Sequence, residues 1–147
     1  MQTADEQTLK DLEFPVLREW LEAYANGPTA QKQLLELEPM VDETLILPAL
    51  HRVAEWLSIK EQGETFPALQ FEELHVELKL LPVKNAVLPQ EGFVRISDAS
   101  YIVNRLIHFF DKREKEFPEL AGLLHSVHYT EEIIEAIDKV FGRKGEI

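Results

Sequence analysis

Residues 90–116 read Q-E-G-F-V-R-I-S-D-A-S-Y-I-V-N-R-L-I-H-F-F-D-K-R-E-K-E, and this stretch decides the fold. Its apolar positions recur at steps of three or four, at Phe93, Ile96, Val103, Leu106, Ile107 and Phe110. This spacing predicts one helix over about residues 90–116, roughly seven turns long at 3.6 residues per turn. The mean helix of globular proteins has only about 11–12 residues, so a helix of this length suits a strut.

Shorter helices are predicted downstream of this strut. The chain turns a corner at E-F-P-E-L, residues 116–120, and Pro118 within this corner is predicted to start a short helix that runs through Leu124. Thr130 is predicted to cap a last helix, with Glu131 and Glu132 at its positive end, and Gly142 to end it.

Upstream, Thr8 to Ala25 is predicted as one helix that buries a stripe of Leu17, Trp20, Leu21 and Tyr24. Asn26-Gly27-Pro28 is a stop signal, and a short helix from Thr29 ends before Pro39.

Two further segments carry open questions. Asp42 can cap a helix that turns Ile46, Leu50, Val53 and Leu57 toward the core, but Pro48 predicts either a kink or a start nearer Leu47.

The second open segment follows a loop, which is predicted over Gly63 to Gln70. Leu74 to Val83 fits a strand by alternation and a helix by its Leu74, Leu78 and Leu81 stripe. Because the chain offers no convincing partner strand, we expect a helix. The prediction is an all-α, elongated helical bundle of roughly six helices, forming a single domain over 1–147.

The composition limits the possible functions. The chain has 147 residues and 45% hydrophobic residues, enough for a real core, and it has no cysteine, which excludes disulfides and thiolate metal sites. No apolar run approaches the ~18 residues of a membrane span, and the polar N-terminus is no signal peptide, so we expect a cytoplasmic protein. The net charge of −12 is expected to repel nucleic acid, because DNA affinity comes largely from Lys and Arg.

Several motifs have both a possible functional role and a plainer structural explanation. No glycine is followed by the Lys-Ser or Lys-Thr of a phosphate-binding loop, which argues against ATP hydrolysis by this chain. His125-x-x-His128 could hold two metal ligands, but no third ligand is obvious beyond Glu131 or Glu132, and the pair falls in an expected turn between helices. We therefore expect ordinary loop histidines and no metal site. Phe71-Glu72-Glu73 is expected to start a helix rather than to read DNA.

The remaining candidates have structural explanations. Asp111–Lys115 and Lys112–Glu116 are expected as ion pairs on a solvated helix end. Trp20 and Trp56 are expected in the core, with one exposed at a docking face as the alternative. We predict no catalytic, cofactor-binding or metal-binding residues, and we assign no DNA-binding residues.

A series of short motifs runs along the whole chain in a fixed order. It begins with Phe14-x-x-Leu17, Leu21, Tyr24-Ala25 and Leu37-x-Pro39, followed by Glu55 in V-A-E-W-L. It continues with Glu73-Leu74, Leu78-Lys79 and Leu88, then Glu116–Leu120, Ile137-Asp138 and Gly145-Glu146-Ile147. In order and spacing this series resembles the core region of the MutS family of DNA mismatch-repair ATPases, in the bacterial branch that lacks the mismatch-reading domain. The chain departs from the pattern at Asn85, where a Gly is usual, and at Pro48, which interrupts a helix.

The resemblance implies a part of a larger machine. In MutS-type proteins this region forms the core and the start of the lever helices, which link a DNA clamp to a dimeric ATPase. It therefore implies a structural coupling domain without catalysis of its own, in a parent that is a DNA-dependent ATPase using ATP and Mg. The expected partners are the remainder of the parent (clamp, ATPase and any nuclease domain), DNA through the parent only, and a second copy of the parent. The alternative is a free-standing acidic helical adaptor that binds another protein.

Overall fold

The computed structural model describes residues 5–142, and within them all regular structure is helical, in eight helices without a strand. The all-α prediction is confirmed, with more helices than the roughly six expected. The chain divides into two compact units, Met1–Val53 and Ala54–Ile147, which are described separately below. Within residues 5–142 no helix has the length and apolar character needed to cross a membrane.

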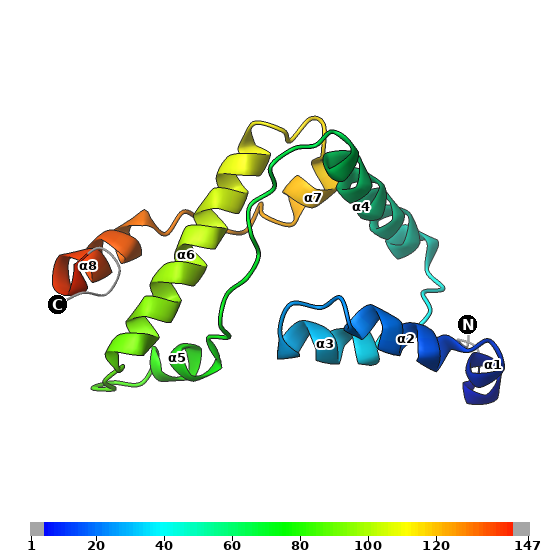
Figure 1. The fold of residues 1–147 in the computed structure, drawn as a ribbon, viewed down its shortest axis with the longest axis horizontal. Helices are drawn as coiled ribbons and strands as arrows, with labels where there is room; N and C mark the ends of the chain where they lie inside the picture. The colour runs from blue at the N-terminus through cyan, green and yellow to red at the C-terminus, as the bar shows by residue number, and fades with distance from the viewer. Residues whose placement is uncertain (1–4, 143–147) are drawn as a thin grey trace. The chain divides into compact units, whose positions relative to one another are not determined.

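The first unit contains α1 (Glu6–Asp11), α2 (Phe14–Glu22), α3 (Pro28–Leu35) and the start of α4 (Glu43–Glu61) (Figure 1). The predicted single helix over Thr8–Ala25 is wrong, because the chain breaks between α1 and α2. Glu13 there adopts a left-handed backbone, φ 56°, which no continuous helix tolerates. Pro15 lies in the first turn of α2, where its missing N–H costs nothing.

The stripe predicted to be buried on α2 is instead largely exposed. Trp20 is 67% exposed and Tyr24 86%, and Leu17 is also exposed, whereas Leu21 is half-buried. None of α1, α2 and α3 contains a buried residue. The stripe was correctly predicted to lie on a helix, but the first unit contains no surface that buries it.

Helix α4 begins at Glu43, so the prediction of a start near Leu47 is wrong. Asp42 caps it as predicted, accepting from the Thr44 N–H at 2.9 Å and from the Thr44 hydroxyl at 2.6 Å. The cap and the turn after it fix this start, and the helix continues through Pro48.

The prediction of which face of α4 enters the core is also wrong. Leu50, Val53 and Leu57 are all more than half exposed, and Ile46 is half-buried. In the second unit the buried side of the helix carries Ile59 instead, because that side faces the aromatic residues near the end of α6.

The second unit contains the end of α4, α5 (His75–Leu80), α6 (Gln90–Asp111), α7 (Pro118–Gly122) and α8 (Glu131–Phe141). The loop predicted from Gly63 is confirmed and continues to Leu74. The choice of a helix over a strand for residues 74–83 is confirmed, but the helix covers only His75–Leu80. Leu78 and Leu81 are exposed, and the buried residue of α5 is Glu77.

The long helix α6 ends at Asp111, five residues before the predicted end. Beyond it the N–H groups of Glu116 and Phe117 both donate to the Arg113 carbonyl, at 2.9 Å each, in tight turns. These turns place Phe117 in the core, where it is 1% exposed. The predicted helical pairs of Asp111 with Lys115 and of Lys112 with Glu116 therefore lose their helical spacing.

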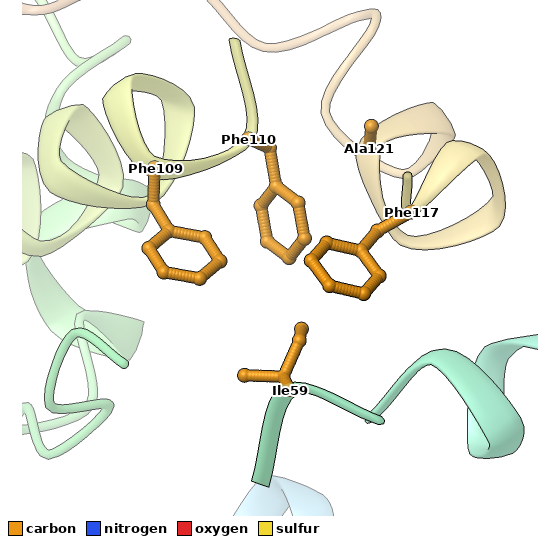
Figure 2. Close-up of a cluster of buried hydrophobic side chains, with 5 residues drawn as sticks. All are labelled: Ile59, Phe109, Phe110, Phe117 and Ala121. Atoms are coloured by element: carbon orange, nitrogen blue, oxygen red, sulfur yellow. The ribbon is translucent and has the colours of Figure 1, made fainter. Parts of the chain in front are cut away.

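The core of this unit forms where α4, α6 and α7 meet. Figure 2 shows its buried members: Ile59, Phe109, Phe110, Phe117 and Ala121. Ile59 comes from α4, Phe109 and Phe110 from the last turn of α6, and Phe117 and Ala121 from the start and body of α7, so burying them fixes the three elements together. Trp56 and Phe66 pack against this cluster from its edge, which confirms the core prediction for Trp56 but not for Trp20.

Candidate functional site

The first feature of the site is a carboxylate from α4 that caps α7. Both oxygens of Glu55 accept backbone hydrogen bonds, from the Glu119 N–H at 3.0 Å and the Leu120 N–H at 2.8 Å. Phe117 at the N-cap position has no polar side chain, and Pro118 has no N–H, so these are the donors that a capping side chain would normally satisfy. Glu55 thus takes the role of an N-cap from 64 residues away and ties α4 to α7.

Aromatic rings extend this junction to α6. Phe66 lies edge-on to Trp56, with ring centroids 4.7 Å apart, and to Phe109 at 5.1 Å. The Arg113 guanidinium lies 4.3 Å from the Phe109 ring centroid and also pairs with Glu64. Edge-to-face geometry is the favoured arrangement of aromatic pairs, so the loop after α4 is held firmly against the end of α6.

The other end of α6 is held by a buried ion pair. Glu77 of α5 is 1% exposed, and its Oε1 accepts from the Arg95 guanidinium, with the Nε at 2.9 Å. These hydrogen bonds lower the pKa of the Glu77 carboxyl and raise the pKa of Arg95. A Cβ on Gly92 would lie 3.3 Å from Glu77 Oε1, so the glycine leaves room for the carboxylate beside α6.

The sequence analysis missed these three residues. Two signals indicate two of them: Gly92 is a glycine inside a strongly helical pattern, which often marks a close approach, and Glu77 is an acid among the apolar residues of a short helix. No such signal indicates Arg95.

Helix α8 is attached along α6. Asn104 Oδ1 accepts from the Thr130 N–H at 2.9 Å and from its hydroxyl at 3.2 Å. The Phe93 and Phe141 rings lie 5.3 Å apart near the other end of α8. Thr130 is at the N-cap position as predicted, but its side chain does not cap the helix, because its hydroxyl donates to Asn104 instead. Gly142 ends the helix with φ 72°, which confirms that prediction.

The loop before α8 is fixed by a tyrosine. The Tyr129 hydroxyl donates to Asp111 Oδ2 at 2.9 Å, which gives Asp111 a partner other than the predicted Lys115. Burial, followed by this hydrogen bond to the carboxylate, raises the pKa of Tyr129. Glu116 likewise accepts from the Gln62 side chain at 2.8 Å. The acids expected to form a solvated helix end therefore hold neighbouring loops.

The residues weighed for chemistry do not come together. His125 lies 3.3 Å from Glu114, and His128 is exposed. Among residues 5–142 no group of three or more possible ligands is placed to hold a metal ion. Phe71, Glu72 and Glu73 all precede α5, which begins at His75, so the helix-start prediction for them is wrong.

Two motif positions find a structural reason. Asn85, which departs from the usual Gly, has φ 64°, a left-handed conformation that Asn tolerates better than most residues. Glu55 and the corner at 116–120 meet directly, as described above. Gly145, Glu146 and Ile147 lie outside the described residues.

Comparison with known proteins gives one distant similarity. The chain is 28% identical over 115 residues to a protein named endonuclease MutS2 from Latilactobacillus sakei subsp. sakei (strain 23K). The similarity covers 78% of this chain but only 14% of that protein's length. No protein-family model matches the chain, and no solved structure matches it. The similarity is a weak indication of a relation to the MutS family.

Proposed function

We propose that this chain is a core and lever segment of a MutS-type DNA-repair or recombination ATPase, without catalysis of its own. The observation that carries the proposal is the similarity to endonuclease MutS2 over most of the chain. It is supported by the direct contact between Glu55 and the 116–120 corner, two of the motifs on which the resemblance rests. In such a parent, cytoplasmic and dimeric, ATP and Mg would be bound by other domains.

The geometry of α6 supports a role in transmitting motion. Its start is held by Glu77, its middle by Asn104, and its end by the aromatic cluster. A helix attached at several points moves as one body with the elements attached to it, which is what a lever requires. In this proposal, nucleotide state in the remainder of the parent repositions α6, and the clamp on DNA follows.

The exposed apolar residues of the first unit favour this proposal over a free-standing adaptor. Leu12, Trp20 and Tyr24 are each at least two-thirds exposed, and Leu45, Leu47, Leu50 and Val53 are each more than half exposed. A large apolar surface normally marks a site that another protein surface covers. We assign that role to the remainder of the parent chain.

The first experiment reads the native coding region downstream of Ile147 and then uses the full-length protein. The proposal expects a frame that continues to a G-x-x-x-x-G-K-[ST] loop. ATP hydrolysis is then measured with and without DNA in wild type and in Glu55→Ala. The expected result is a loss of DNA stimulation with basal hydrolysis retained, while Glu61→Ala on the exposed side of α4 retains both.

Two results would count against the proposal. A stop directly after Ile147 would favour the acidic adaptor. Sub-micromolar DNA binding by this chain alone at physiological salt would contradict its role as a segment that does not grip DNA.

A further inference from the structure

An extended segment, residues 64–74, runs antiparallel to α6 within the second unit, and we call it the strap (Figure 1). Three contacts fix its course. Glu64 pairs with Arg113, the Phe66 ring lies 5.1 Å from the Phe109 ring, and Glu72 lies 3.7 Å from Arg95. Residues further along the strap contact residues nearer the start of α6, so the two segments run in opposite directions, side by side over most of the helix.

A row of three hollows lies between the strap and α6, with volumes of about 310, 690 and 410 Å³. The first two share Arg105, and the last two share Glu72 and Asp98, so they adjoin one another along α6, and we call the row the groove. On α6 the lining residues follow steps of three or four from Glu91 to Lys112. That span is about 30 Å at 1.5 Å per helical residue, the length of about nine residues of extended peptide at 3.3 Å each.

The groove has an apolar middle, and the strap that borders it carries unpaired backbone. Phe71 and Tyr101 line the central hollow and are 54% and 47% exposed. Within the described chain, the backbone N–H groups of residues 68–72 donate to no protein acceptor. An exposed extended segment with unpaired donors can accept a neighbouring strand, as in other cases of strand addition to a sheet edge.

The two ends of the groove differ in charge. Glu91 and Asp98 line the hollow at the start of α6, where Arg95 is already paired with Glu77. Arg105 and Lys112 line the hollow at the other end. A ligand that carries opposite charges at its two ends fits this arrangement, and a nucleic acid, with negative charge along its whole length, does not.

We propose that the groove binds an extended peptide segment of a partner protein, about nine residues long. Its backbone pairs with the strap, and its central apolar side chain contacts Phe71 and Tyr101. Its acidic end lies over Arg105 and Lys112, and its basic end lies at the start of α6. The groove lies wholly within Ala54–Ile147 and its occupation requires no ATPase, so the proposal stands or falls separately from the MutS-type function.

The test uses the 147-residue chain and fluorescein-labelled peptides, with binding measured by anisotropy. One peptide reads Asp-Asp-Val-Thr-Phe-Thr-Val-Lys-Lys, the second is its reverse, and the control, Asp-Lys-Val-Thr-Phe-Thr-Val-Asp-Lys, has the same composition without charged ends. We expect one of the first two to bind at least about tenfold more tightly than the control. Equal binding of all three peptides, or no binding of any, would overturn the proposal.

Charge reversal in the protein provides the second arm. Arg105→Glu should weaken the preferred peptide by about tenfold, and the matched control Lys79→Glu, an exposed lysine of α5 outside the groove, should not. Replacing the peptide's two aspartates by lysines should restore binding to Arg105→Glu. Helix content measured by circular dichroism verifies that both variants fold. An equal effect of the two substitutions, or no rescue, would show that binding follows net charge and refute the groove.

Discussion

Replacing Glu55 with alanine removes the only side-chain acceptor described for the first turn of α7. The Glu119 and Leu120 N–H groups, now bonded at 3.0 and 2.8 Å, would lose their partner at once. Loss of a helix cap costs about 0.5–2 kcal/mol, and the charge and the two bonds place this case near the upper end. We therefore expect Glu55→Ala to lower the free energy of unfolding by about 2 kcal/mol, or Tm by about 4–8 °C for a chain of this size.

The variant Glu55→Gln separates the cap from the packing of the side chain. Glutamine keeps the length of the side chain and one acceptor oxygen but directs an NH₂ group at the second backbone donor. Its cost should fall between those of wild type and Glu55→Ala, at about 1 kcal/mol or more. Glu61→Ala, an exposed acid of the same helix, should stay within about 0.5 kcal/mol of wild type.

Chemical denaturation gives the free energies, and amide hydrogen exchange gives the location. Exchange should accelerate at the amides of Glu119 and Leu120 in Glu55→Ala, and less in Glu55→Gln. If Glu55→Ala unfolded like Glu61→Ala and those amides kept their protection, the cap would have no energetic role and the link between α4 and α7 would be wrong.

Other expectations follow from the same structure. Phe117→Ala, at a side chain that is 1% exposed, should lower the free energy of unfolding in urea by about 3–5 kcal/mol. Leu123→Ala, at a residue that is 55% exposed, should lower it by less than about 1 kcal/mol. Similar values for the two variants would contradict the assignment of Phe117 to the core. Because Arg95 lowers the pKa of Glu77 from its ordinary value of 4.5, the folded state is favoured by ionised Glu77. That stabilisation should be complete above pH 4.5 and be lost as pH falls below it, so Glu77→Gln should show a weaker fall of Tm on acidification than wild type. Helices α1 to α3 contain no buried residue, so amides in Met1–Val53 should exchange faster than those of α6, and uniform protection would refute this difference.

Helical periodicity predicted the elements of the second unit well. The spacing of apolar residues along α6 gave its start at Gln90, and Ile107 and Phe110 are buried as the pattern requires. Its end was placed too late because Asp111–Glu116 has the composition of a helix terminus, whereas burial of Phe117 bends the chain there into turns. Tertiary packing thus overrode a local propensity, as it commonly does.

The faces that are buried were harder to predict than the helices. Trp20 and Leu57 lie on apolar stripes that predict burial, but a stripe gives no information about which surface covers it or whether this chain provides one. The polar contacts that fix α6 were also missed. Glu77, Arg95 and Asn104 bond to residues on other elements, and no spacing along the chain reveals such pairs.

Two of the motifs that carry the resemblance have a clear structural role in the second unit. Glu55 caps α7, and the 116–120 corner receives that cap. Residues with such a role preserve a scaffold, so they account for a distant similarity without implying a shared reaction. In the function proposed above, this chain acts through surfaces at which it meets other molecules, and such contacts require suitable surfaces. Two surfaces of different character meet that requirement: the exposed apolar residues of Met1–Val53, which need a cover, and the groove beside α6, whose opposite charges select an oriented ligand.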